Sequence, residues 1–69
     1  MERQPVSSSN VAEVGYDVTS NTMEILFVNG RVYQYFDVPE RVYEELMRAT
    51  SIGQYFQAEI RGVYRYARV

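Results

Sequence analysis

Apolar and polar residues alternate along three short segments in the first half of the chain, and a period of two is typical of β-strands. The pattern predicts strands over residues 11–18 and 23–28, and a third strand that contains Tyr33 and Tyr35. Gly15 interrupts the first strand, which indicates either a bulge or the close approach of another segment. The first half of the chain is therefore expected to form an antiparallel sheet.

The spacing of apolar residues lengthens to that of an α-helix after Pro39. Val42 and Leu46 lie four positions apart, which places them on one face of a helix. Asp37 with Glu40 three positions later matches a capping box, and Pro39 suits the first helical turn because its missing N–H costs nothing there. The sequence therefore predicts that a helix begins directly after Asp37.

A second helix is predicted to begin after Ser51, which forms a capping box with Gln54. Gly62 is a typical stop signal, and residues 63–69 form either a short strand or a tail. The apolar side of this helix consists of Ile52, Tyr55, Phe56, Ile60 and Val63. Together these elements predict an α+β fold, in which a three-stranded antiparallel sheet is followed by a two-helix hairpin packed on one face.

The hairpin closed by Asn29-Gly30 has two alternative registers. A two-residue turn opposes Phe27 to Val32 and sends both tyrosines of the return strand to the face away from Phe27. A three-residue loop with a left-handed glycine opposes Phe27 to Arg31 and brings both tyrosines onto its face. We favour the second register, because it gathers large apolar side chains on one face and leaves Gln34 outside.

The length of 69 residues allows one domain with a thin core. Residues 1–10 contain Pro5 and three consecutive serines, which predict a loosely ordered leader, and residues 11–69 are expected to form the single domain. No apolar run approaches the length of a membrane span, and the first residues lack the apolar region of a signal peptide. We therefore expect a cytoplasmic protein without a membrane partner.

A characteristic combination of residues occurs along the chain. It consists of Gly15-Tyr16-Asp17, Gly30, Tyr33, Tyr35, Val38-Pro39, Ser51, Gly53, Tyr55-Phe56 and Ile60-Arg61. This combination resembles the KTSC domain family, and the match covers nearly the whole chain. The family takes its name from the C-terminal region of some lysyl-tRNA synthetases, and it also occurs as small stand-alone bacterial proteins. The resemblance implies the type of domain, and the association with a synthetase suggests RNA as a ligand.

The composition excludes most enzyme chemistry. The chain has no histidine and no cysteine, so it lacks the usual ligands of zinc and transition metals, the commonest general base and the thiol nucleophile. It also has no lysine, and arginine does not exchange its proton near neutral pH. We therefore expect a non-catalytic binding module that holds no metal and no cofactor.

Positive charge is concentrated at the C-terminal end of an otherwise acidic chain. Residues 1–60 hold four arginines and nine carboxylates, whereas residues 61–69 hold three arginines and no carboxylate. Arginine interleaved with tyrosine suits RNA through phosphate contacts and base stacking, whereas the net charge of −2 opposes RNA binding. The candidate contacts for RNA or a protein partner are Arg31, Tyr33, Tyr35, Arg61, Tyr64, Arg65 and Arg68.

These candidates also have a purely structural interpretation. The two strand tyrosines could be packing residues whose hydroxyl groups reach the edge of the core. The C-terminal arginines could fold back onto Glu40, Glu44 or Glu45 in weak surface ion pairs. The sequence leaves both interpretations open.

Helices on one face of a three-stranded sheet leave the other face uncovered. Leu26, Val28 and Phe36 are expected there, and together with Val32 they form an apolar patch. The alternative function is therefore protein–protein interaction or self-assembly through this face, with a homodimer as the simplest product. The leader or the C-terminal tail of the same chain could instead cover the patch.

Overall fold

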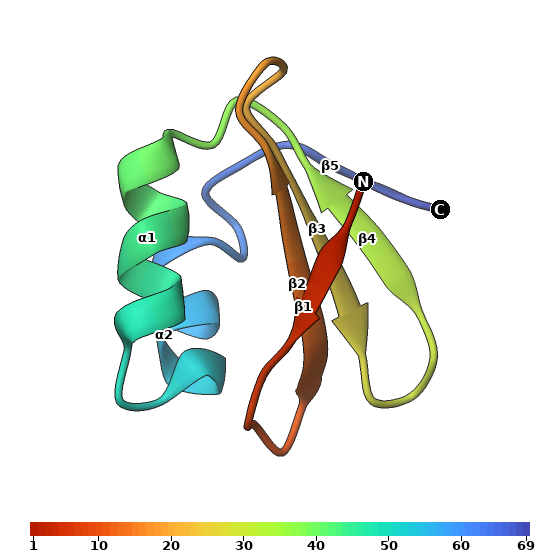
Figure 1. Ribbon diagram of the computed structural model, residues 1–69, viewed down its shortest axis with the longest axis vertical. Coiled ribbons are helices and arrows are strands. Elements are labelled where there is room, and N and C mark those ends of the chain that lie inside the picture. Colours follow the sequence, from red (N-terminus) through yellow and green to blue (C-terminus); the bar gives the residue numbers. More distant parts are fainter.

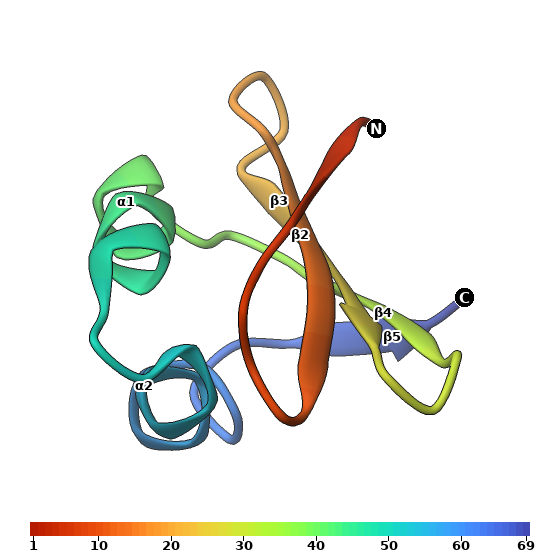
Figure 2. The same cartoon turned by 60° about the horizontal axis from the view of Figure 1, so that its bottom comes forward.

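Five antiparallel strands follow one another in chain order across a single sheet, and both helices lie on the same face of it (Figure 1, Figure 2). The strands are β1 (Arg3–Pro5), β2 (Val11–Asp17), β3 (Thr22–Phe27), β4 (Val32–Tyr35) and β5 (Tyr66–Arg68). The helices α1 (Glu40–Arg48) and α2 (Ile52–Glu59) lie between β4 and β5 in the sequence. The computed structural model describes all residues from 1 to 69.

The fold is α+β as predicted, but the sheet has five strands where the sequence predicted three. The two additional strands form the edges, because β1 pairs with β2 and β5 pairs with β4. β5 corresponds to the strand alternative for residues 63–69, and β1 lies within the segment 1–10. Each edge strand has three residues, which is too short for an alternating pattern to reveal it.

The segment between β1 and β2 is held against the sheet by backbone contacts. The Val6 N–H donates to the Ala12 carbonyl at 3.0 Å, which extends the pairing of the two strands. Ser8 Oγ accepts hydrogen bonds from the N–H groups of Asn10 and Val11 at 3.2 and 3.3 Å. The serine therefore stabilises the turn that leads into β2.

Gly15 allows the close approach of β1. A Cβ atom at this position would lie 2.7 Å from the Glu2 carbonyl oxygen and 3.0 Å from Arg3 Cγ. Of the two alternatives drawn from the sequence, close approach of another segment is therefore correct at Gly15. The irregularity in the register of β2 lies elsewhere, between Val11 and Glu13, and this shift turns Val11 into the core.

The β3–β4 hairpin has the three-residue loop with a left-handed glycine. The Phe27 N–H donates to the Arg31 carbonyl at 2.9 Å, and Gly30 has a φ of 90°. In this register Ile25 lies opposite Tyr33, so the two tyrosines of β4 share the helix-covered face of the sheet with Ile25 and Phe27. The favoured register is therefore confirmed.

The core is one layer of apolar side chains between the sheet and the helices. The strands contribute Val11, Val14, Met23, Ile25 and Tyr35, the helices contribute Val42, Leu46, Ile52 and Phe56, and the connecting segments contribute Val38 and Ile60. Burying one large apolar side chain stabilises a protein by about 1.5–3 kcal/mol. In a domain of this size the burial of each of these side chains contributes a large share of the free energy of unfolding.

The predicted capping box at Asp37 is wrong. The residue before α1 is Pro39, no side chain caps the helix, and Asp37 has a left-handed φ of 57°. This conformation turns the chain sharply out of β4, so that Val38 is fully buried and its N–H donates to the Asn21 carbonyl at 2.9 Å. Burial of Val38 therefore decides the geometry here, and the Asp37 carboxylate faces solvent.

The predicted cap of α2 is present, because Ser51 Oγ accepts a hydrogen bond from the Gln54 N–H at 3.2 Å. The helix ends at Glu59, and Gly62 follows with a left-handed φ of 78°. Val63 lies beyond the helix and is 60% exposed, so its predicted place on the apolar side of α2 is wrong. Neither helix has the length and hydrophobicity that crossing a membrane would require.

Replacing Gly15 by alanine should separate β1 from β2, because the new methyl group would overlap the carbonyl oxygen of Glu2, directly before β1. We expect Gly15→Ala to lower the free energy of unfolding by about 1–3 kcal/mol and to speed amide hydrogen exchange in residues 3–6. Gly53→Ala is the matched control, since the nearest atom to its Cβ would be 3.6 Å away. Unchanged exchange in β1 of the Gly15→Ala protein would contradict this account.

Candidate functional site

A cleft of about 310 Å³ opens between the β3–β4 hairpin, β5 and the C-terminal end of α2. Its lining is almost entirely aromatic, amide and arginine, and it contains no carboxylate. The lining residues are Phe27, Asn29, Arg31, Tyr33, Tyr35, Phe56, Gln57, Arg61, Gly62 and Tyr66. The cleft therefore brings together four of the residues that the sequence analysis selected, namely Arg31, Tyr33, Tyr35 and Arg61.

Tyr33 is the centre of an aromatic cluster in this cleft. Its ring centroid lies 5.7 Å from that of Phe27, 6.4 Å from that of Tyr35 and 5.6 Å from that of Tyr66. Phe56 joins from α2, with its ring 5.5 Å from Tyr35 in an edge-to-face arrangement. The contacts fix the rings relative to one another, and each such pair contributes about 0.5–1.5 kcal/mol beyond its buried area.

The cluster passes from buried to exposed across the cleft. Phe56 and Tyr35 are 3% and 5% exposed and form the floor, whereas Tyr66 is 60% exposed at the mouth. Tyr33 is half-buried between them. The cleft therefore has a closed aromatic floor and an aromatic ring at its rim.

The three tyrosine hydroxyl groups of the cleft have no hydrogen-bond partner within the protein. Other tyrosines of the fold are engaged, because Tyr16 donates to the Val38 carbonyl and Tyr55 donates to Glu45 Oε1 at 2.8 Å. Burial, assisted by the neighbouring Tyr33 and Tyr66 and opposed by Arg61, raises the pKa of Tyr35 to about 12. The Tyr35 hydroxyl is therefore a hydrogen-bond donor at neutral pH.

Arg31 and Arg61 give the cleft its charge. Neither forms an ion pair, and the Arg61 guanidinium donates only to Gln57 Oε1, at 2.9 Å. Arg68 lies opposite Tyr33 in the β4–β5 register, so it is on the same face of the sheet and also lacks an ion-pair partner. Two unpaired arginines thus line an aromatic cleft in a chain of net charge −2, and Arg68 lies on the same face of the sheet outside this lining.

The remaining predicted contacts, Tyr64, Arg65 and Arg68, do not line the cleft. Arg65 Nη2 lies 2.7 Å from Asp37 Oδ2, and its guanidinium stands 5.7 Å from the centre of the Phe36 ring. Tyr64 is half-buried and packs against the core. Strand alternation explains the division, because Tyr66 and Arg68 share one face of β5 and Arg65 precedes Tyr66 by one residue.

Tyr66 was not selected from the sequence, although it belongs to the segment of alternating arginine and tyrosine. Treating residues 63–69 as a strand would have grouped Tyr66 with Arg68 and separated both from Arg65. That assignment needs a partner strand, and the pairing of Tyr66 with Tyr35 is visible only in the folded chain.

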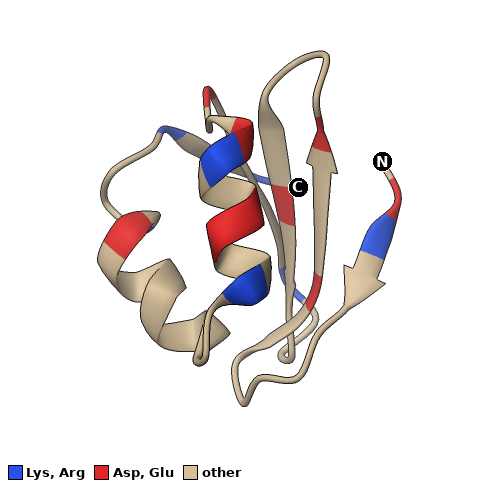
Figure 3. Cartoon of the chain, turned by 60° about the vertical axis from the view of Figure 1, so that its left-hand side comes forward, with Lys and Arg blue, Asp and Glu red and all other residues tan.

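The acidic residues of α1 are not the partners of the C-terminal arginines. Arg65 pairs with Asp37, whereas Glu45 lies 3.8 Å from Arg41 Nη1 within α1 and accepts from Tyr55. Figure 3 shows charge of both signs on α1, whereas α2 carries only one acidic segment. The alternative in which the C-terminal arginines pair with the α1 glutamates is therefore not found. No group of carboxylates comes together to form a metal site.

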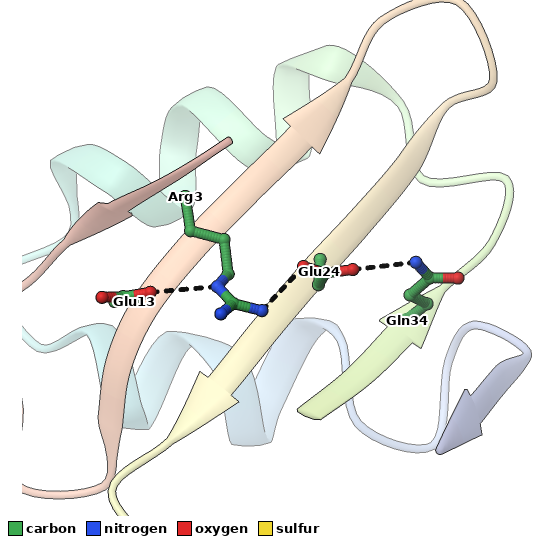
Figure 4. A network of polar contacts seen from close by, with 4 residues as sticks. All are labelled: Arg3, Glu13, Glu24 and Gln34. Carbon is green, nitrogen blue, oxygen red and sulfur yellow. Dashed lines mark hydrogen bonds and ion pairs between the residues drawn. The ribbon is translucent and has the colours of Figure 1, made fainter. Parts of the chain in front are cut away.

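A row of polar side chains crosses the other face of the sheet. Arg3 bridges Glu13 and Glu24 with contacts of 3.0 and 2.8 Å, and Gln34 Nε2 donates to Glu24 at 2.8 Å (Figure 4). The helices lie behind the sheet in that view, so the row belongs to the uncovered face. It joins β1, β2, β3 and β4 through side chains in addition to the backbone.

This row divides the apolar patch predicted for the uncovered face. Leu26 lies opposite Val32 on one side of the Glu24–Gln34 pair, and Phe36 lies on the other side beneath Arg65. Val28 belongs to the hairpin loop, is 60% exposed and lines a depression that also includes Phe56 of α2. The edge strands extend the sheet rather than cover the patch.

Residues 7–69 match the family model of the KTSC domain. The chain belongs to the KTSC domain family. The crystal structure of a KTSC domain protein from Yersinia pestis superposes with a TM-score of 0.97 at 40% sequence identity, over 99% of this chain and 96% of that chain. The α+β arrangement of sheet and helices described above is therefore the KTSC fold.

KTSC relatives occur in proteins of very different length. An uncharacterised protein from Stutzerimonas stutzeri is 34% identical over 70 residues, which cover 100% of this chain and 99% of that protein. A lysine–tRNA ligase from Trichormus variabilis is 43% identical over 61 residues, which cover 88% of this chain and 11% of the ligase. Because this chain spans only a small part of the ligases, the match does not indicate catalysis.

The raised pKa of Tyr35 predicts a loss of stability in alkali. The native state holds the phenolic proton more tightly than the unfolded state, so the stabilisation is complete below pH 10 and is lost as the pH rises towards about 12. We expect the free energy of unfolding, measured by urea denaturation, to fall over this range. In Tyr35→Phe the fall should be smaller, and Tyr55, whose pKa is also raised to about 12, should account for part of the remainder. An identical pH profile in wild type and Tyr35→Phe would contradict the assignment.

Proposed function

We propose that this KTSC domain is a non-catalytic module that binds single-stranded RNA in the cleft between β4, β5 and α2. The observation that carries the proposal is the combination of a rim aromatic ring, two unpaired arginines and no carboxylate in one cleft. Aromatic rings stack on bases, and guanidinium groups contact phosphates without requiring a particular base sequence.

Tyr66 and Tyr33 are the residues best placed to stack on an RNA base. Tyr66 is 60% exposed, and its ring lies 5.6 Å from that of Tyr33, so a base placed against Tyr66 also comes close to a second ring. Stacking contributes about 1–3 kcal/mol per base. A cleft of about 310 Å³ has room for one nucleotide of a single strand but no room for a duplex.

The local charge supports an anionic ligand although the chain as a whole is acidic. Glu13 and Glu24 are already bridged by Arg3 on the opposite face of the sheet, and Asp37 is paired with Arg65. Arg31 and Arg61 remain available in the cleft. Because exposed charges are screened beyond about 10 Å at ordinary ionic strength, the local arginines outweigh distant carboxylates.

The chemistry of the cleft supports binding rather than catalysis. Its titratable groups are tyrosines and arginines, and none of these is a general base near neutral pH. Several relatives of this chain are named as ligases for tRNA, which makes RNA the first ligand to test.

RNA binding is tested by an amide NMR titration of the labelled protein with a short single-stranded oligouridine at low and moderate salt. We expect saturable shifts at residues 31–35 and 61–68. Arg61→Glu should raise the dissociation constant about tenfold and make its salt dependence shallower. Arg65→Glu is the matched control, because this arginine belongs to the same segment but pairs with Asp37 outside the cleft.

If Arg61→Glu and Arg65→Glu weaken RNA binding equally, the binding is general electrostatic attraction and not recognition by the cleft. No shift at the highest RNA concentration would end the RNA proposal. In that case Tyr33 and Tyr35 would be packing residues alone.

Self-association through the uncovered face is a second proposal, and Leu26 with Val32 supports it. These two residues are opposite neighbours in β3 and β4, and the polar row does not separate them. A dimer should be detected by sedimentation equilibrium, and Leu26→Asp should give a folded monomer because a buried carboxylate is costly. A wild-type protein that is monomeric at high concentration would exclude this proposal.

A further inference from the structure

We infer that the floor of the cleft is a phosphate site formed by the Tyr35 hydroxyl and the Arg61 guanidinium, and that it receives the terminal phosphate of a single-stranded RNA. This inference rests on the proposed function and specifies which part of the RNA is recognised. The phosphate monoester is placed at the floor, and the base of the same nucleotide stacks on Tyr66 at the mouth.

The site depends on the Tyr35 hydroxyl, which has no hydrogen-bond partner and opens into the cleft. The Tyr35 residue is 5% exposed, and its ring is enclosed by the aromatic cluster. Every fully buried side-chain oxygen and nitrogen in the structure has a hydrogen-bond partner. The Tyr35 hydroxyl has no partner in the protein, so it is not fully buried. The remaining exposed area of Tyr35 therefore includes the hydroxyl, which opens into the cleft that the residue lines.

Arg61 supplies the charge at this point. It follows α2 directly, and its hydrogen bond of 2.9 Å to Gln57 Oε1 holds the guanidinium while leaving most of its N–H groups unused. Arg61 also acts electrostatically on Tyr35, whose pKa it lowers against the larger effect of burial. Because both residues line the same cleft, we infer that the hydroxyl and the guanidinium offer a neutral donor and a charged donor to one anion.

The closed floor indicates a terminal phosphate rather than an internal one. A phosphodiester continues into the chain on both sides, so a strand that placed an internal phosphate at the floor would need a second exit from the cleft. Phe56 and Tyr35 close that direction, with exposures of 3% and 5%. A terminal monoester ends at its phosphate and meets no such obstacle.

The number of donors favours a phosphate over a carboxylate. The hydroxyl groups of Tyr33, Tyr35 and Tyr66 are unpartnered, and Arg31 and Arg61 carry two charges. A phosphate monoester offers three terminal oxygens and about two negative charges near neutral pH. A carboxylate offers two oxygens and one charge, so it would leave more of the donors unsatisfied.

The inference is tested by NMR and calorimetric titration with uridine 5′-monophosphate, uridine 3′-monophosphate, uridine and inorganic phosphate. We expect at least one monophosphate to bind at least tenfold more tightly than uridine, with shifts at residues 35 and 61. Tyr35→Phe should weaken monophosphate binding by at least threefold and leave uridine binding unchanged. Tyr43→Phe is the control, since Tyr43 packs against Tyr16 away from the cleft.

An oligouridine with a terminal phosphate should likewise bind more tightly than the same oligouridine with hydroxyl groups at both ends. If both oligomers bind equally and Tyr35→Phe has no effect while Arg61→Glu still weakens binding, the phosphate site is wrong and the proposed function stands. If no RNA or nucleotide binds, both are wrong. A peptide with a free C-terminal carboxylate that shifts the same amides, when the monophosphates do not, would replace the inference with carboxylate recognition.

Discussion

The left-handed conformation of Gly30 decides on which face of the sheet the tyrosines of β4 lie. The glycine permits the loop in which Phe27 opposes Arg31, and every later residue of β4 takes its side from that pairing. A shift by one residue would send Tyr33 and Tyr35 to the uncovered face and bring Gln34 into the core. The aromatic cluster, the floor of the cleft and the polar row on the opposite face all follow from this register.

A chain of 69 residues has few side chains to spare, and the aromatic residues serve both packing and the cleft. The Tyr35 ring is part of the core while its hydroxyl opens into the cleft, and Phe56 joins α2 to the sheet while closing the cleft floor. Because these rings are held by several neighbours at once, the cleft is largely formed before any ligand arrives. The binding that we propose would therefore require little ordering of the protein, which favours affinity.

The arginines show how a fold can give different roles to residues of one type. Arg3 and Arg65 are engaged with carboxylates, whereas Arg31 and Arg61 form no ion pair and line the cleft. Because Arg3 and Arg65 are paired with carboxylates elsewhere, the charge of the cleft comes from Arg31 and Arg61. An overall charge of −2 therefore says little about the electrostatic character of this cleft.

The sequence alone determined the three central strands, the two helices, the cap at Ser51 and, through Asn29-Gly30 and the apolar pattern, the correct hairpin register. These features depend on neighbours in the chain, whose spacing can be read directly. The edge strands, the conformation of Asp37 and the separation of Arg65 from Arg61 were decided only by the tertiary structure. They depend on contacts between segments far apart in sequence, and edge pairing is made by backbone groups that nearly all residues share, so no side-chain pattern records it.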